Sequence, residues 1–293
     1  MAQSPAHRFG QIVGETLEAA LIPLLQDFAR THGLYLDRKG TRPCRRGKKC
    51  TWVDANGNAH DLDFVLERGG TPDKIGSPAA FIETAWRRYT KHSRNKVQEI
   101  QGAIEPLAAT YSRAGTFKGA VLAGVFTDGA LAQLRSLGFS VVYVSYDAVV
   151  AAFLKFGIDA RSDEGTPDPD FQAKVEAFEK LTPSRRKRLA AALANANDRA
   201  MREFFAALES TVSRQIERIV ILALHGQAQE VLTVADALRF VEGYADDGRT
   251  KPIERYDIEV RYNNGNRISG SFSDKAGAIE FLGGFLPVTP QAP

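Results

Sequence analysis

Two short apolar segments of this sequence carry carboxylates at positions where a β-strand would bury them. The segment 61–66 contains Asp61 and Asp63, and the segment 81–86 contains Glu83. Because an unpaired charge is costly to bury, carboxylates in such runs need a cation, a metal ion or solvent beside them. Acidic groups from two neighbouring strands could bind one divalent cation together, since Mg²⁺ prefers oxygen ligands.

Clusters of lysine and arginine flank these acidic segments. Residues 38–49 include seven basic side chains and no acid, and a second cluster occupies 87–96. On a chain with a net charge of only +3, this distribution predicts local surfaces for a polyanion, and solvated surface charge is the alternative. The candidates for contact with nucleic acid are Arg42, Arg45, Arg46, Lys48, Lys49, Arg87, Arg88, Arg94 and Lys96.

The composition is that of an ordinary globular protein. With 293 residues, 44% of them apolar and 25% charged, the chain can bury one large core and a smaller one. No segment approaches ~18 consecutive apolar residues, and the N-terminus lacks the apolar stretch of a secretory signal. We therefore expect a cytoplasmic protein with no membrane partner. Cys44 and Cys50 lack a second ligand pair nearby, which favours reduced thiols over a zinc site.

The elements that would position the acids begin with an amphipathic helix over 9–30, with Glu18 at the border of its apolar face. A hairpin follows, because Asn56 and a glycine lie between two strand-like runs, the second of which covers 60–66. A further strand covers 80–86. These three elements should carry all of the candidate acids.

Alternation along the strands predicts how the acids are presented. Side chains alternate faces along a strand, so Asp61 and Asp63 should lie together on the face opposite the core. If the two acidic strands are neighbours, Asp63 and Glu83 can bind the same Mg²⁺. The metal would polarise a phosphodiester and lower the pKa of an attacking water, and nearby cations would stabilise the developing charge. The expected chemistry is metal-dependent hydrolysis of a phosphodiester bond.

The rest of the chain predicts an α/β fold with a second, smaller domain. Helices and apolar strands alternate after the second acidic strand, which is typical of a mixed sheet with helices on its faces. The expected domains are a catalytic α/β domain at 1–165, a helical connector at 166–215 and a small α+β domain at 216–293. The expected helices are 92–111, 128–137, 147–156, 233–244 and 274–282, and the expected strands are 119–126, 140–145, 218–224, 256–262 and 267–272.

An aspartate at the start of one strand, a glutamate within the next and this alternating continuation resemble the PD-(D/E)XK nuclease superfamily, particularly type II restriction endonucleases. The resemblance covers roughly residues 9–155 and implies a restriction-endonuclease-like core. It implies that Asp63 and Glu83 are catalytic and hold Mg²⁺. It also implies that Glu18 is the acid that the first helix often adds, and that Asp61 is a second candidate ligand.

The sequence departs from this family's motif at two positions. Leu62 precedes Asp63 where the motif has proline, which family members tolerate, but Ala85 stands in the place of the motif lysine. Lys91 is the nearest cation with the right chemistry, and we expect it to be catalytic. Lys96, Arg87 or Arg88 could serve instead. The alternative is that the site has lost its catalysis.

Together these features predict a Mg²⁺-dependent DNA endonuclease of restriction type that acts on duplex DNA. Double-strand cleavage needs two active sites, so the resemblance implies a homodimer, and a cognate DNA methyltransferase would be its partner in the same system. Two alternatives stay open. One is a catalytically silent DNA-binding or assembly protein with the nuclease fold, and the other is a structure-specific repair nuclease.

Overall fold

The computed structural model describes residues 4–89, 93–111, 115–223, 228–244 and 255–286. The chain divides into two units, Met1–Glu209 and Ser210–Pro293. The boundary differs from the expected one, because most of the segment expected as a connector belongs to the first unit. None of the helices in the described residues is both long enough and apolar enough to cross a membrane.

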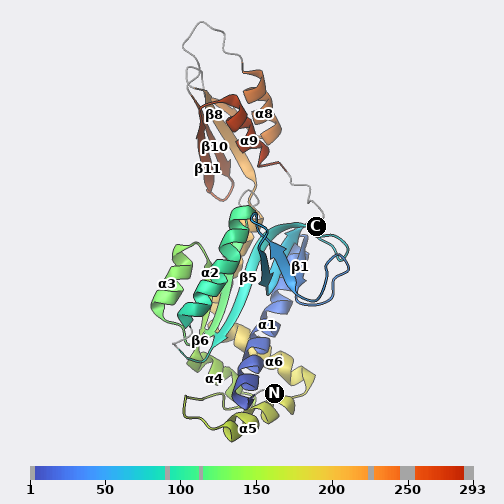
Figure 1. The fold of residues 1–293 in the computed structure, drawn as a ribbon, viewed down its shortest axis with the longest axis vertical. Helices are drawn as coiled ribbons and strands as arrows, with labels where there is room; N and C mark the ends of the chain where they lie inside the picture. Colours follow the sequence, from blue (N-terminus) through green and yellow to red (C-terminus); the bar gives the residue numbers. More distant parts are fainter. Residues whose placement is uncertain (1–3, 90–92, 112–114, 224–227, 245–254, 287–293) are drawn as a thin grey trace. The chain divides into compact units, whose positions relative to one another are not determined.

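A five-stranded mixed sheet forms the centre of the first unit (Figure 1). The first three strands in its spatial order pair antiparallel and the last three pair parallel. The predicted α/β fold with a mixed sheet is confirmed at this level. In spatial order the strands are β1 (Leu34–Arg38), β4 (Phe64–Arg68), β5 (Ser77–Arg87), β6 (Phe117–Gly124) and β7 (Ser140–Ser145).

Helices α1 (Pro5–Thr31) and α2 (Ser93–Thr110) lie on opposite sides of β5 (Figure 1). The Ser4 hydroxyl caps α1 by accepting the amide N–H of His7, and Pro5 suits the first helical turn. The apolar stripe of α2 packs with β5 and β6 in one continuous core. The remaining helices of this unit are α3 (Asp128–Ser136), α4 (Tyr146–Leu154), α5 (Asp168–Glu179), α6 (Pro183–Ala194), the 3₁₀ turn Asn195–Asn197, and the first part of α7 (Asp198–Val212).

The predicted hairpin around Asn56 is confirmed, but its second arm is shorter than expected. Strands β2 (Cys50–Val53) and β3 (Ala59–Leu62) pair as a separate two-stranded sheet. The chain then bends at Asp63 and enters the main sheet as β4. The single strand predicted over 60–66 is therefore wrong. Its first half pairs with β2 and its second half pairs with β1 and β5.

The second unit has the α+β character that the sequence predicted. Its antiparallel sheet has the spatial order β11-β10-β8-β9, and its helices α8 and α9 share one core with the sheet. The central strands alternate buried and less buried residues, as expected for a sheet covered on one face. The elements are β8 (Ile216–Ala223), β9 (Gln229–Val231), α8 (Val234–Gly243), β10 (Tyr256–Tyr262), β11 (Arg267–Phe272) and α9 (Lys275–Gly283).

Candidate functional site

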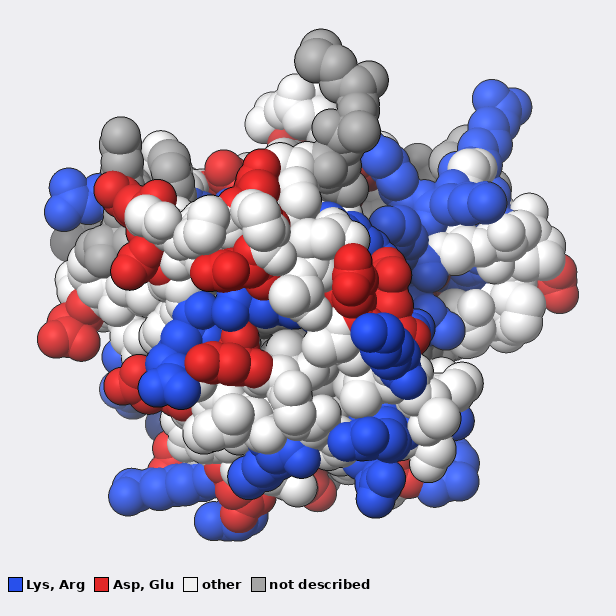
Figure 2. Space-filling model, turned by 90° about the horizontal axis from the view of Figure 1, so that it is seen from below, with Lys and Arg blue, Asp and Glu red and all other residues white. Residues whose placement is uncertain are grey.

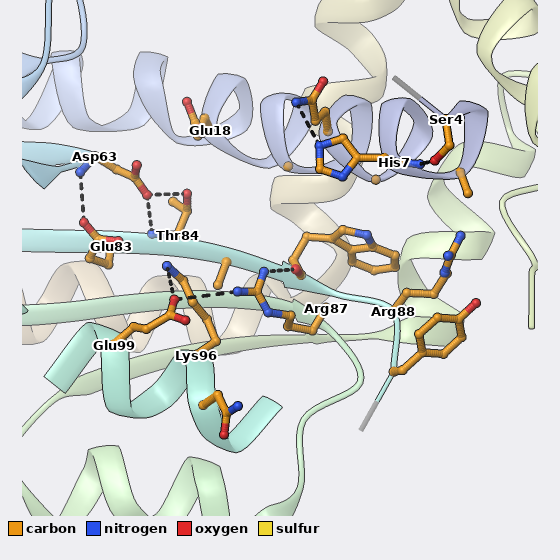
Figure 3. A pocket seen from close by; sticks show the side chains of 18 residues that line it. Ser4, His7, Glu18, Asp63, Glu83, Thr84, Arg87, Arg88, Lys96 and Glu99 are labelled. Atoms are coloured by element: carbon orange, nitrogen blue, oxygen red, sulfur yellow. Dashed lines mark hydrogen bonds and ion pairs between the residues drawn. The ribbon is translucent and has the colours of Figure 1, made fainter. Parts of the chain in front are cut away.

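A cleft opens where β5 extends beyond its neighbour β4. Strand β4 begins at Phe64, which pairs with Ile82, whereas β5 continues beside β6 as far as Arg87. Among the described strands, none pairs with the other edge of residues 83–87. Helices α1 and α2 flank this free edge and enclose a cleft of about 780 Å³ (Figure 3). The candidate acids Glu18, Asp63 and Glu83 all line it.

Asp63 is held at the free edge of β5 by Thr84. The amide N–H and the hydroxyl of Thr84 both donate to Asp63 Oδ2, at 2.8 and 2.7 Å. The carboxylate therefore satisfies a strand N–H that no described strand reaches. Its second oxygen, Oδ1, stays available for another partner. The bend at Asp63 thus fixes one carboxylate oxygen and leaves the other in the cleft.

Glu83 lies next to Asp63 and is 7% exposed. Its Oε1 accepts the backbone N–H of Asp63 at 3.1 Å. Burial and the charge of Asp63 raise the pKa of Glu83 to about 8, and Glu18 adds to this effect. The charge of Lys96 and the hydrogen bond from Asp63 oppose the rise only in part. Near neutral pH, Glu83 therefore keeps its proton in the absence of a further cation.

Glu18 approaches the same place from α1, as Figure 3 shows. Burial and the charge of Asp63 raise the pKa of Glu18, and the charge of Lys39 opposes this rise. Glu18, Asp63 and Glu83, which we call the cleft acids, are thus electrostatically coupled. Within the described residues, no group of three or more His, Cys, Asp or Glu side chains is arranged to hold a metal ion. The cleft acids would have to draw closer together to share one.

The predicted cations Arg87, Arg88 and Lys96 line the same cleft. Lys96 comes from the first turns of α2 and its ammonium acts electrostatically on Glu83. Arg88 lies further along the cleft, where its guanidinium is 4.5 Å from the ring centroid of Phe171. The structure therefore places these three cations in the same cleft as the acids, and the charge of Lys96 is the one that acts on Glu83. Arg94 is exposed on α2, outside the lining of the cleft, and Lys91 lies outside the described residues.

The side chains of Arg42 and Arg45, both predicted as DNA contacts, are only 2% and 6% exposed and are bound by acids of the sheet, so they do not form part of the exposed basic surface. Arg42 binds both oxygens of Glu67, at 2.5 and 3.0 Å, and Glu67 is 0% exposed. Asp37 Oδ2 lies 3.0 Å from Arg42 Nη1 and 2.6 Å from Arg45 Nη1, and it accepts the thiol of Cys50. We call the two acids and two arginines the anchor network, because they fasten the basic loop 39–49 to the sheet.

Asp61 lies outside the site, which corrects its prediction as a metal ligand. It is exposed on the hairpin, where Lys49 and Thr51 bind its two oxygens at 2.5 and 2.6 Å. The bend at Asp63 separates the two aspartates, so the predicted shared face does not form. Arg46, Lys48 and Lys49 are exposed on the basic loop. Cys44 and Cys50 are free thiols, as expected.

Sequence reasoning missed several polar residues of the cleft. Thr84 anchors Asp63, and Glu99 binds two of the cations. On α1, His7 and Gln11 also line the cleft. Gln11 precedes Glu18 by seven residues and His7 precedes it by eleven, and these spacings place all three on one side of a helix, which could have identified them.

Basic side chains on the surface form separate patches. Figure 2 shows the end of the first unit that carries α5 and the start of α1, where lysine and arginine side chains alternate with acidic ones. This alternation of basic and acidic side chains agrees with the small net charge of +3. The lining of the cleft likewise combines cations with acids. Comparisons with protein-family models, with curated proteins and with solved structures found no match to this chain.

Proposed function

We propose that this protein is a Mg²⁺-dependent endonuclease that hydrolyses phosphodiester bonds in duplex DNA. The observation that carries the proposal is the meeting of the three cleft acids with Lys96 and Arg87 in one cleft. Buried like charges raise the free energy of the ionised site, and a divalent cation relieves that repulsion. We further propose that the mixed sheet belongs to a restriction-endonuclease-like core, in which Asp63 and Glu83 are the two acids of the catalytic motif.

The donor set of the cleft acids fits Mg²⁺. All of its ligands would be carboxylate oxygens, and Asp63 Oδ1 and Glu83 Oε2 are the oxygens that no hydrogen bond described above occupies. Glu18 would complete the set. When bound, Mg²⁺ supplies a polarised phosphate and a water of lowered pKa. Because Glu83 must first lose its proton, metal affinity should rise with pH.

Lys96 is proposed to replace the motif lysine, whose place Ala85 takes. Its side chain comes from α2 and is 21% exposed, and the charge of its ammonium acts on Glu83. A cation there stabilises the charge that develops on the phosphate as a water oxygen bonds to phosphorus and the bond to the sugar oxygen breaks. Thr84 keeps Asp63 oriented during this step. Lys91 stays a prediction for the same role.

The cleft has room for a bulky anionic substrate. Gly10 and Gly14 lie on the side of α1 that lines it, and a Cβ at either position would meet nothing within 4 Å. Each glycine costs the helix about 1 kcal/mol relative to alanine, and no packing contact with the described residues explains that cost. Close approach of a DNA backbone would explain it. A homodimer and a cognate methyltransferase are proposed from the resemblance to restriction endonucleases, and a cytoplasmic location is proposed from the two free cysteines.

The test is cleavage of methylated and unmethylated plasmid DNA with Mg²⁺ or EDTA. We expect Mg²⁺-dependent fragments from the wild type and a loss of at least about 1,000-fold in rate for Asp63→Asn and Glu83→Gln, as expected for loss of a metal ligand. Asp61→Asn is the matched control, since it makes the same change two residues away and outside the cleft. It should cut like the wild type.

Binding to DNA, measured by fluorescence anisotropy in EDTA, separates the alternatives. Cutting that persists in Asp63→Asn or Glu83→Gln would refute the site. Intact DNA together with salt-sensitive binding would favour the catalytically silent binding protein. Nicks or cuts at branches and ends, without discrete fragments, would favour a structure-specific nuclease. Lys91→Ala and Lys96→Ala, compared side by side, identify the catalytic cation, because its replacement lowers the cleavage rate at saturating DNA far more than it lowers DNA affinity.

A further inference from the structure

One carboxylate oxygen in the cleft binds two cations at once. Glu99 Oε2 lies 3.3 Å from Lys96 Nζ and 3.8 Å from Arg87 Nη2 (Figure 3). Arg87 comes from the end of β5, whereas Lys96 and Glu99 come from α2. The two cations thus converge on one anionic oxygen from two different elements, within the lining of the same cleft as the acids.

We propose that Arg87 and Lys96 form a binding site for a backbone phosphate of DNA, and that Glu99 occupies this site in the free protein. The proposal rests on the function proposed above, because it assumes that DNA enters the cleft. A non-bridging phosphate oxygen carries the same kind of charge as Glu99 Oε2 and makes the same charge-assisted bonds. A planar guanidinium beside a lysine suits a phosphate particularly well.

Glu99 is held weakly enough to be displaced. Its side chain is 59% exposed, and the nitrogen atom of Arg87 is near the outer limit of an ion pair. Lys96 is its neighbour at i−3 on the same helix, an arrangement that contributes little to stability. Release of Glu99 into solvent should therefore cost little compared with the gain from two contacts to a phosphate.

The exchange also changes the surroundings of Lys96. In the free protein its ammonium is shared between Glu83, on which its charge acts, and Glu99. Once a phosphate replaces Glu99, both cations contact the substrate beside the cleft acids. Glu99 would thus act as an internal competitor that sets the affinity of the cleft for DNA. Anions that make fewer contacts with Arg87 and Lys96 than a phosphodiester would not displace it.

Binding of a short fluorescein-labelled DNA duplex in EDTA tests the proposal without any need for cleavage. We expect Glu99→Gln to bind about three- to tenfold more tightly than the wild type, because the competing charge is gone. Glu179→Gln is the matched control for net charge, since Glu179 is exposed on α5 outside the cleft lining. It should change affinity less than about twofold.

A double-mutant cycle decides whether Glu99 acts through Arg87. Arg87→Gln should weaken binding at least about threefold, and Glu99→Gln should give little further gain in that background. An equal gain in both backgrounds, a gain no larger than that of Glu179→Gln, or no DNA binding by the wild type would overturn the proposal. Failure of Mg²⁺-dependent cleavage would refute the enzyme activity while leaving this binding result intact.

Discussion

Two clusters of buried acids lie toward opposite ends of β4, one around Glu67 and one around Asp63, and only the first is neutralised by cations within the protein. In the anchor network, Glu67 is 0% exposed and binds Arg42 through both oxygens. In the cleft, Glu83 is 7% exposed, and the charge that acts on it most strongly is that of another acid, Asp63. The anchor network is built on β1, β4 and the basic loop, whereas the cleft acids come from α1, from the bend before β4 and from β5. Only the second lies in a cleft.

The comparison distinguishes buried acids that stabilise the fold from buried acids that could bind a ligand. Burial by itself would lower the pKa of Arg42, but its bonds to Glu67 and the charges of Glu67 and Asp37 raise it overall. The arginine therefore keeps its charge, and the acids have no capacity left for another ligand. In the cleft, burial and Asp63 raise the pKa of Glu83 to about 8, which only a further cation would reverse. Unmatched buried acids thus indicate where a metal ion would bind.

Removal of Arg42 should break the anchor network and give the largest effect. Arg42→Met leaves Glu67 buried without a partner and should cost about 3–5 kcal/mol in free energy of unfolding. Both tryptophans, Trp52 and Trp86, belong to the first unit, so urea unfolding followed by their fluorescence reports on it. Arg46→Met, an exposed neighbour, should stay within about 0.5 kcal/mol. A loss below about 1 kcal/mol for Arg42→Met would refute the role of the network.

Neutralising the buried acid of the cleft, Glu83, should change the free energy of unfolding in the opposite direction and stabilise the protein at high pH. The pKa of Glu83 is about 8 in the folded protein against 4.5 as the ordinary value, so folding favours the protonated form. The stability that this proton contributes is fully present below pH 4.5 and is lost as pH rises to about 8.

Glu83→Gln should therefore match the wild type at low pH and become more stable than it, by on the order of a few kcal/mol, at pH 9 in EDTA. Urea unfolding at several pH values checks this. The exposed Glu179→Gln should show no such trend. If the difference in free energy of unfolding between the wild type and Glu83→Gln does not grow with pH, other groups in the protein already balance the charge of Glu83.

Much of this arrangement could be predicted from the sequence, because it depends on local patterns. The strands at 140–145, 256–262 and 267–272 were placed at their observed bounds from apolar alternation and turn residues. Asp63 and Glu83 meet because β4 and β5 are consecutive antiparallel strands. The pairing of β4 with β5 follows from their order along the chain, so it was predictable.

The rest depends on contacts that no local pattern records. Arg42 looks like part of a surface cluster, and its burial follows only from pairing with Glu67, which lies 25 residues away. The bend at Asp63 occurs within a segment that has no turn residue to mark it, because the chain changes partner strand there. Strand β1 was missed because it is short and partly polar, and only its pairing with β4 defines it.

Thr84→Val should change stability less than Arg42→Met or Glu83→Gln does. The variant keeps the size of the side chain and removes one of the two bonds to Asp63 Oδ2, so it should cost about 1–2 kcal/mol in stability. Because a group that orients a metal ligand typically controls affinity, Mg²⁺ binding by calorimetry should weaken about 10- to 100-fold. Thr51→Val, which removes the corresponding bond to exposed Asp61, is the control and should leave Mg²⁺ affinity unchanged. Equal Mg²⁺ affinity in the wild type and Thr84→Val would contradict the placement of Asp63.

Lys49→Met should give the smallest change in stability and still alter function, which separates it from Arg42→Met. Both residues are cations of the basic loop paired with an acid, but the Lys49 side chain is 75% exposed and that of Arg42 is 2% exposed. Solvent screens the pair with Asp61, so its loss should change the free energy of unfolding by no more than about 0.5 kcal/mol. An exposed cation of this kind is free to neutralise a DNA phosphate, so the salt dependence of DNA binding should fall by about one unit in slope. An unchanged slope would show that the basic loop does not contact DNA, and the cations of the cleft would then account for binding alone.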